Sequence, residues 1–395
     1  MGLALLAACG GGGGSTDHPD AAPGSDAGSA DAAIDTPPAC VEPASQVLPA
    51  DPNTNLAYAT GMRLFSNQHA AIYFFDDTPG EKARIWDGTA WTTHQVYGAA
   101  SGFFGLFGFT EIDGRATLFA NIDDQTSDSG KLRYWEQLES GDFASGATIP
   151  NVAGFEARMA RYTASTQVLA IAGDDQATTL QSYERNASGT WTVETVASLQ
   201  TPSNLYAVGL GLLADGTSAI AAQSTSGLEL YRRASGVWHP YQTLAGGNVP
   251  SARVEFPPDG APADAPAIAV YTDPSTGHPR GLFIDRATGL PSGATDLVAQ
   301  SIGFSGPNVS IAFEPDGKTG KILIVTGNNA PWLVSFENGQ FTPAQELRPD
   351  LVFDGVPALF YSACGEYLLL HDTRAPTDDP GSADLILEPL ASFTN

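Results

Sequence analysis

The chain has 395 residues, and its 44 Asp and Glu outnumber its 18 Lys and Arg, which gives a formal net charge of −26 at pH 7. A surface this acidic repels nucleic-acid phosphates and anionic lipid headgroups, so we expect no nucleic-acid partner. The acidity is either the ordinary property of a soluble exported protein or a field that attracts cations. No later run of 18 apolar residues occurs, so no membrane-spanning helix is expected.

The N-terminus carries a short export-like motif. Leu6, Ala7 and Ala8 precede Cys9, which resembles the lipobox of bacterial lipoprotein signal peptides. The resemblance implies that residues 1–8 are a signal peptide and that Cys9 carries a lipid. The stretch before Cys9 is short and has no Lys or Arg, so we expect the natural start codon to lie upstream. Gly10 follows Cys9 where Asp would favour the inner membrane, which implies an outer-membrane lipoprotein, periplasmic or at the cell surface.

Gly, Ala, Asp, Ser and Pro dominate the segment after the lipobox, up to residue 39. Such a composition cannot bury enough apolar surface to offset the entropy of ordering, so residues 9–39 are predicted to be a lipidated, disordered linker. The folded domain is then residues 40–395.

A pattern of about 50 residues recurs in this domain. An aromatic residue or Leu closes a Gly- or Asn-containing turn, at spacings of 47 to 52 residues: Trp91, Phe143, Trp191, Trp238, Leu290, Phe341 and Phe393. Each repeat also contains a strand-like run that is apolar on both faces: 71–75, 116–122, 168–172, 219–222, 267–271, 322–325 and 367–370. Repeats of this period with buried strands predict an all-β, seven-bladed β-propeller with four strands in each blade.

The last repeat predicts how the ring closes. Phe393 should open a fourth strand, but the sequence runs out at Asn395, so blade 7 lacks one strand. We expect residues 41–48 to supply it, because an open edge strand is a liability. Cys40 precedes this segment and Cys364 lies in the first hairpin of blade 7. With Cys9 lipidated, a Cys40–Cys364 disulfide is predicted in an oxidising compartment.

The width of a blade is the difficulty for that disulfide. Three strand spacings of about 4.8 Å exceed the Cα separation that a disulfide allows, which is about 4.4 to 6.8 Å. The residues before Val41 must therefore cross under the blade.

Two repeats carry a family resemblance. Residues 183–191 and 231–238 each lead from a Tyr strand through a Gly turn to a Trp, which resembles the repeats of sialidase-like bacterial propellers. This resemblance implies a propeller fold and, in sialidases, hydrolysis of an acid sugar held by an arginine cluster. The Asp-box of sialidases, Ser-x-Asp-x-Gly-x-x-Trp, is absent from the turns between third and fourth strands.

Polar clusters follow the apolar runs and should gather on one face of the propeller. The candidate ligand-binding carboxylates among them are Asp77, Asp124, Asp175, Asp273 and Asp372. Carboxylates suit a cation or sugar hydroxyls. Alternatively, Asp ends strands because its side chain bonds the local backbone. No loop has the pattern of a dedicated calcium loop, so no metal site is predicted.

Three arginines near the starts of the predicted innermost strands form a second candidate. Arg63, Arg158 and Arg253 are spaced 95 residues apart, in blades 1, 3 and 5. Three guanidiniums converging on the Asp-rich face can hold a carboxylate. The alternative is that neighbouring Asp residues neutralise each of them.

Other catalytic signals are weak. The six His show no metal-ligand spacing, and no Gly-x-Ser-x-Gly elbow or phosphate loop occurs. We therefore expect no cofactor and a monomer that binds an envelope protein or glycan without catalysis, touching the membrane through its lipid alone. One alternative is a sialidase-like glycoside hydrolase, which needs two carboxylates, or a carboxylate and an activated Tyr, near the arginines. The other is a structural spacer.

Overall fold

The computed structural model describes the following parts of the chain: residues 46–48, 61–64, 70–75, 81–97, 104–112, 115–122, 131–149, 156–163, 167–173, 179–185, 190–198, 206–299, 308–326, 330–348, 351, 358–362, 364–372 and 385–394. All of them belong to one compact unit, residues 40–395. Within these ranges, no helix is both long and apolar enough to span a membrane.

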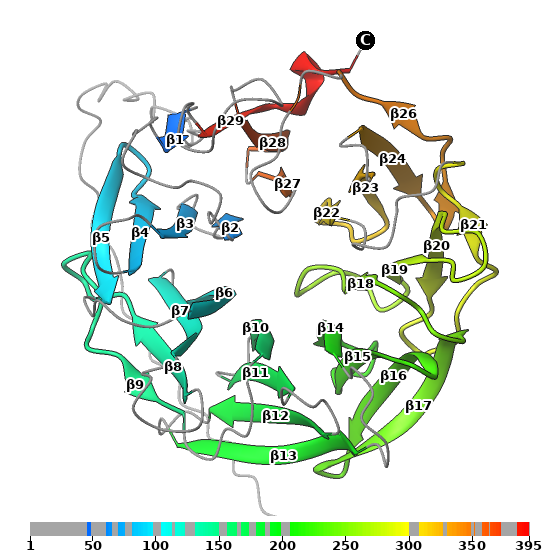
Figure 1. Ribbon diagram of the computed structural model, residues 1–395, viewed down its shortest axis with the longest axis horizontal. Helices are drawn as coiled ribbons and strands as arrows, with labels where there is room; N and C mark the ends of the chain where they lie inside the picture. The colour runs from blue at the N-terminus through cyan, green and yellow to red at the C-terminus, as the bar shows by residue number, and fades with distance from the viewer. Residues whose placement is uncertain are drawn as a thin grey trace, which may run out of the picture. The chain divides into compact units, whose positions relative to one another are not determined.

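The described strands form seven sheets, which we number along the chain (Figure 1). Sheet 1 contains β2 (Gly61–Leu64), β3 (Ala70–Phe75), β4 (Glu81–Trp86) and β5 (Trp91–Tyr97). Sheet 2 contains β6 (Phe104–Ile112), β7 (Arg115–Ile122), β8 (Lys131–Glu136) and β9 (Ala147–Thr148). Sheet 3 contains β10 (Glu156–Thr163), β11 (Gln167–Gly173), β12 (Thr179–Arg185) and β13 (Trp191–Ser198).

The second half of the chain continues this order. Sheet 4 contains β14 (Tyr206–Leu212), β15 (Ser218–Ser224), β16 (Gly227–Ala234) and β17 (Val237–Gly246). Sheet 5 contains β18 (Ala252–Glu255), β19 (Ala267–Thr272), β20 (Pro279–Ile284) and β21 (Thr295–Asp296). Sheet 6 contains β22 (Asn308–Phe313), β23 (Thr319–Val325), β24 (Pro331–Glu337), β25 (Gln340–Phe341) and β26 (Gln345–Glu346). Sheet 7 contains β1 (Gln46–Leu48), β27 (Ala358–Tyr361), β28 (Tyr367–Asp372) and β29 (Leu385–Pro389), and the 3₁₀ helix η2 (Leu390–Ser392) follows it.

The all-β propeller class is confirmed. The prediction of a regular ring of seven four-stranded blades is wrong, because the described sheets differ in their number of strands and in the length of their outer strands. Sheet 6 has five strands, because both β25 and β26 pair with β24. The outer strands β9, β21, β25 and β26 have only two residues each. Pro291, Gly293 and Pro343 lie in the outer segments of sheets 5 and 6, and such residues interrupt a hydrogen-bond ladder.

The N-terminal strand completes sheet 7. β1 pairs antiparallel with β29, and Gln46 lies opposite Ile386. The strand order β1-β29-β28-β27 therefore places an N-terminal strand outside the C-terminal ones. Only residues 46–48 of the predicted segment are described as a strand. The expectation that Phe393 opens a fourth strand is corrected, because Phe393 follows η2 and its ring lies 5.0 Å from that of His371.

Neighbouring sheets pack through their apolar second strands. All six residues of β19 are buried, and their side chains alternate between a core shared with sheet 4 and a core shared with sheet 6. Small residues set the close spacing of the sheets. At Gly211 of β14, a Cβ atom would lie 2.2 Å from Cγ of Phe256, which begins the turn after β18. The sheets thus surround a common axis, with β2, β6, β10, β14, β18, β22 and β27 innermost (Figure 1).

The connections fall on two faces. Turns that join first to second and third to fourth strands share one face, which we call the hairpin face. Turns that join second to third strands, and the connections between sheets, share the other, which we call the loop face. Two Asp-Gly turns, Asp215-Gly216 and Asp316-Gly317, lie on the hairpin face: Gly216 and Gly317 adopt φ of +79° and +64°, which favours glycine.

Candidate functional site

The predicted carboxylates belong to the loop face, and the structure describes one of their side chains. Asp77, Asp124 and Asp175 lie outside the described residues. Asp372 is the last residue of β28, where its backbone pairs with Leu385, and its side chain is outside the description. Asp273 directly follows β19 and is described in full.

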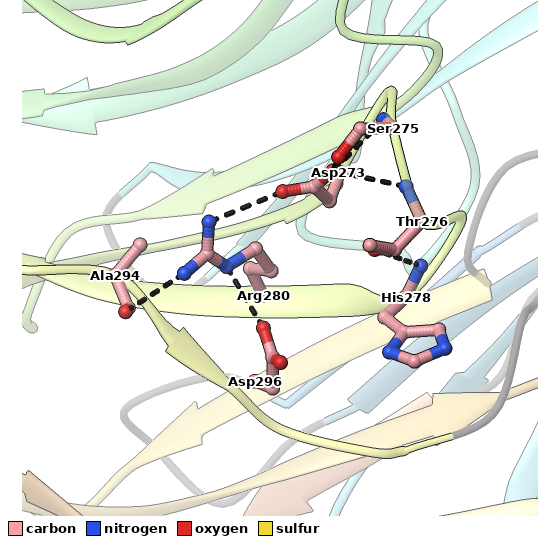
Figure 2. A network of polar contacts seen from close by, with 7 residues as sticks. All are labelled: Asp273, Ser275, Thr276, His278, Arg280, Ala294 and Asp296. Atoms are coloured by element: carbon pink, nitrogen blue, oxygen red, sulfur yellow. Dashed lines mark hydrogen bonds and ion pairs between the residues drawn. The ribbon is translucent and has the colours of Figure 1, made fainter.

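Asp273 organises the turn between β19 and β20 (Figure 2). Its Oδ1 accepts hydrogen bonds from the backbone N–H of Ser275 at 2.8 Å and of Thr276 at 3.1 Å, and from the Ser275 hydroxyl. Its Oδ2 accepts a hydrogen bond from Nη1 of Arg280 at 3.1 Å. Both carboxylate oxygens are therefore engaged, Oδ1 by the turn itself and Oδ2 by Arg280 of β20.

Arg280 connects this turn to the outer edge of sheet 5. Its Nε lies 2.9 Å from Oδ1 of Asp296, and its Nη2 donates to the Ala294 carbonyl at 3.2 Å (Figure 2). The guanidinium thus bridges two carboxylates and one carbonyl.

The electrostatics of Asp273 follow from these contacts. The hydrogen bond from the Ser275 hydroxyl, followed by the backbone bonds, lowers the pKa of Asp273 to about 2. The carboxylate is therefore ionised at neutral pH and is suited to neither general acid nor general base catalysis. For this residue the arrangement matches the turn chemistry that the sequence offered as the alternative to ligand binding.

The three predicted arginines lie on innermost strands but not all at one level. Arg253 in β18 pairs with Val270 of β19, near the loop face. Arg158 in β10 lies at a bulge between the Ala157–Ala172 and Met159–Ile171 pairs. Arg63 in β2 pairs with Ala71. It therefore lies closer to the hairpin face than Arg253 does, by roughly two residues or about 7 Å along the strand.

Of these three, the structure describes the side chain of Arg253. It is 44% exposed, and its Nη2 lies 3.2 Å from Oε2 of Glu255 on the same strand. The side chains of Arg63 and Arg158 lie outside the description. Convergence of the three guanidiniums therefore stays a prediction, and the register gives it no support for Arg63.

A different set of arginines links the sheets on the hairpin face. Arg185, at the end of β12, forms an ion pair with Glu136 of sheet 2. Arg233, near the end of β16, forms ion pairs with Glu184 and, at 2.7 Å, with Glu194, both in sheet 3. Each arginine thus joins its sheet to the preceding one.

Arg286 continues the series with hydrogen bonds to backbone carbonyls. This buried side chain donates to the carbonyls of Ala265 at 2.7 Å, Pro262 at 2.6 Å and Leu212 at 3.2 Å. Leu212 belongs to sheet 4, so this guanidinium ties sheet 5 to sheet 4. Sequence reasoning missed the series, although Arg185, Arg233 and Arg286 recur 48 and 53 residues apart at the ends of third strands.

Two tyrosine–glutamate pairs occur among the described residues. The Tyr231 hydroxyl donates to Glu229 Oε2 at 2.6 Å, and the Tyr367 hydroxyl donates to Glu314 Oε1 at 2.9 Å. Burial, and then the bonded glutamate, raise the pKa of both phenols well above the ordinary value. Both tyrosines therefore remain protonated hydrogen-bond donors at neutral pH, which is not the state of an activated nucleophile.

Cys364 lies in the hairpin between β27 and β28 and is disulfide-bonded. The chain has three cysteines, and the other two, Cys9 and Cys40, lie outside the described residues. The identity of the partner as Cys40 stays a prediction. In the part of the chain that the structure describes, no group of three or more His, Cys, Asp or Glu is arranged to hold a metal ion.

Comparisons with known proteins define the class of the chain as a β-propeller. No protein-family model and no curated protein matches the sequence. Among solved structures, a lectin from Burkholderia pseudomallei is similar with a TM-score of 0.58 and 12% identity, covering 82% of this chain and 99% of the lectin. The Dos1 propeller is similar with a TM-score of 0.51 and 8% identity, covering 83% of this chain and 77% of that one.

A trans-sialidase is also among the similar structures. The intramolecular trans-sialidase from Ruminococcus gnavus has a TM-score of 0.45 and 13% identity, covering 87% of this chain and 96% of the enzyme. A likeness this distant supports no statement about activity. The predicted resemblance to sialidase-like propellers therefore holds for the propeller fold alone.

Proposed function

We propose that this chain is an envelope-anchored β-propeller that binds a protein or glycan ligand without catalysis. One observation carries the proposal: ionisable side chains that could serve catalysis are engaged in the fold itself. Asp273 is saturated by its own turn and by Arg280. Tyr231 and Tyr367 are held protonated by burial and by their glutamates. What such a propeller offers a ligand is a preformed surface.

The proposed anchor and location rest on the sequence. Cys9 is the lipidated residue, residues 9–39 are the tether, and the propeller stands at the outer membrane, on its periplasmic side or at the cell surface. The propeller acts as a monomer and touches the membrane through the lipid alone. The motif at residues 6–9 and the composition of the segment behind it support this placement.

A second candidate function is a sialidase-like glycoside hydrolase acting at the face with the arginines and aspartates. The exposure of Arg253 on an innermost strand favours it, because a guanidinium there can meet an acid sugar. Its pairing with Glu255 counts against it, since the carboxylate competes with an anionic ligand. Hydrolysis would further require two suitably spaced carboxylates, or one carboxylate and an activated tyrosine.

A glycan array and a hydrolysis assay, run with the same Cys9→Ser protein, distinguish these functions. Cys9→Ser keeps the whole chain and removes the lipid, so the protein can be applied in aqueous buffer. Binding to an array glycan, or crosslinking to one envelope protein, without turnover of fluorogenic glycosides is the expected result. Release of the fluorophore from a sialoside would overturn the proposal in favour of the hydrolase. If the protein neither binds a ligand nor turns over a glycoside, the structural spacer is the function that remains.

A further inference from the structure

A pair of tyrosines lies at the hairpin-face end of sheet 7, beside sheet 6. Tyr361 ends β27, Tyr367 begins β28, and the two are cross-strand partners. Their ring centroids are 4.9 Å apart, with an edge-to-face angle of 71°. Both side chains are half-buried and pack against the core cluster shared by sheets 6 and 7. Each therefore presents part of a ring and a phenolic end beyond the core.

Two carboxylates of sheet 6 approach these rings. Glu314, just after β22, accepts the Tyr367 hydroxyl at Oε1, and its Oε2 has no partner among the described residues. Asp316, in the same turn, accepts hydrogen bonds from the backbone N–H of Lys318 and Thr319, both at 2.9 Å. Partial burial, then Glu314 and Asp316, raise the pKa of Tyr361. One cation also lies in this site, because Lys321 Nζ is 5.1 Å from the centroid of the Tyr367 ring.

Tyr361 keeps its hydroxyl available. Within the described parts of the chain, this hydroxyl forms no hydrogen bond, in contrast to the Tyr367 hydroxyl. Gly365 faces it: a Cβ atom there would lie 3.7 Å from the phenolic oxygen, so the glycine leaves that side of the hydroxyl open. The described surroundings thus offer a free hydroxyl beside a free carboxylate oxygen of Glu314.

The hairpin-face boundaries between sheets 4 and 5 and between sheets 5 and 6 differ from the boundary at which the tyrosine pair lies. Between sheets 4 and 5, Phe256 packs directly onto Gly211. Between sheets 5 and 6, Pro257, Ala261 and Ala265 surround Gly317, and a Cβ atom there would meet all three within 3.0 Å. At these two boundaries apolar groups fill the space beside the glycines, and the polar links there are Arg286 to the Leu212 carbonyl and Lys318 to Asp264. The tyrosine pair at the third boundary is therefore not what packing of the repeat demands.

The hairpin that carries the tyrosines is rigidly held. Ser362 Oγ accepts hydrogen bonds from the backbone N–H of Cys364 at 3.2 Å and of Glu366 at 3.3 Å. The Ser362 N–H donates to the Glu366 carbonyl at 2.8 Å, and the Gly365 N–H donates to the Ser362 carbonyl at 3.1 Å. The disulfide at Cys364 adds a covalent restraint. A ligand would therefore meet a preorganised surface, which reduces the entropy lost on binding.

We propose that Tyr361, Tyr367 and Glu314 form a binding site for a neutral or amino sugar, which names the ligand class within the binding function proposed above. The apolar side of a sugar ring packs on the exposed part of the tyrosine rings. Its hydroxyls donate to Glu314 Oε2 and exchange hydrogen bonds with the Tyr361 hydroxyl. Acidic sugars are disfavoured here, because Glu314, Asp316 and the net charge of −26 repel them.

Titration calorimetry on the full Cys9→Ser chain tests the site, with chitotriose and glucosamine as probes and sialyllactose as the acidic comparison. Tyr361→Ala should abolish measurable binding of the neutral and amino sugars. Tyr361→Phe, which keeps the ring, and Glu314→Gln, which keeps an acceptor for Tyr367, should each weaken binding by about tenfold. Tyr241→Phe is the matched control, since it removes a phenol at the outer edge of sheet 4 and should leave binding unchanged.

The outcomes separate this site from the broader function. Sugar binding that Tyr361→Phe and Glu314→Gln leave unchanged overturns the site while the binding function stands. A chain that binds no sugar on the array or in the calorimeter overturns the site and confines the binding function to protein ligands. Preference for sialyllactose, or binding of polylysine in place of sugars, overturns the proposed ligand class. Melting curves show whether Tyr361→Ala folds, and Tyr361→Phe decides the matter if it does not.

Discussion

At the scale of single residues, the arginines divide by what surrounds them rather than by how they are spaced. Arg253 is exposed on an innermost strand, whereas Arg286 is buried and bonded to three backbone carbonyls. The sequence pointed to Arg253 because Arg63, Arg158 and Arg253 are equally spaced by 95 residues, and such a spacing carries no information about strand register. The recurrence of Arg at the ends of third strands was visible too, but its partners come from neighbouring sheets and could not be identified without the fold.

Replacing Arg286 should destabilise the propeller strongly. Arg286→Met keeps most of the side-chain volume and removes the guanidinium that donates to the buried Ala265 carbonyl and to the carbonyls of Leu212 and Pro262, which should cost about 2 to 3 kcal/mol of the free energy of unfolding. Arg253→Met is the control, and it should cost less than about 1 kcal/mol because an exposed ion pair contributes little. Urea unfolding of the two variants measures the difference, and equal losses would contradict the role given to Arg286.

Asp273 should make stability depend on pH in the acid range. Its folded pKa, about 2, is below the unfolded value of about 3.8, so its contribution to stability is fully present above the unfolded value and is lost as the pH falls towards 2. Asp273→Asn should therefore be less stable than wild type at pH 7. The gap between their free energies of unfolding should narrow between about pH 4 and 2. Unfolding at pH 7, 4 and 2.5 measures the gap. Glu346→Gln, at an exposed position in β26, is the control, and a gap that is constant with pH would contradict the argument.

At the scale of elements, inner strands follow the sequence, whereas outer strands follow it only in part. The outer strands β5, β13 and β17 begin at or beside the predicted aromatic residues and have 7, 8 and 10 residues. The run predicted at 267–271 is the strand Ala267–Thr272, because apolar residues on both faces fit only a strand packed between two sheets. In sheets 5 and 6 the apolar pattern of the outer strands is weaker. There β21 and β25 have only two residues each, where Pro and Gly interrupt the pairing. Register was beyond the sequence, since the bulge at Arg158 and the level of Arg63 depend on pairing geometry.

Gly211 shows how closely two sheets approach, and it gives a test of that packing. A Cβ atom at Gly211 would lie 2.2 Å from Phe256 Cγ, so Gly211→Ala should cost about 2 to 3 kcal/mol through overpacking. In a Phe256→Gly background, which removes both the ring and the Cβ atom that the added methyl group would overlap, the same change should cost much less. Gly246→Ala, with no atom within 4 Å of the added Cβ, should be nearly neutral. A double-mutant cycle by urea unfolding measures this coupling, and additive losses would contradict the packing argument.

At the scale of the whole molecule, the chain closes on itself through its two ends. β1 lies beside β29, so a strand from before sheet 1 completes the sheet that contains the last strand of the chain. The sequence indicated this closure because its last repeat is one strand short, which is a property of the repeat count rather than of local propensity. The disulfide at Cys364 stands in the same sheet, in the hairpin between β27 and β28.

The disulfide should hold this closure, and its partner can be identified by the same experiment. A crosslink between Cys364 and Cys40 restrains a loop of more than 300 residues, so its loss should cost roughly 3 to 5 kcal/mol of the free energy of unfolding. Cys364→Ser and Cys40→Ser should each lower the melting temperature by the same amount as a reductant does, and the reductant should then have no further effect on either variant. Cys9→Ser should melt like the wild type, both with and without the reductant. If Cys9→Ser melts early and Cys40→Ser does not, Cys364 pairs with Cys9, and the lipid assignment of Cys9 fails with the predicted pairing. Peptide mapping without reductant identifies the bonded pair directly, and two free thiols at Cys40 and Cys364 would remove the covalent closure while leaving the pairing of β1 with β29 in place.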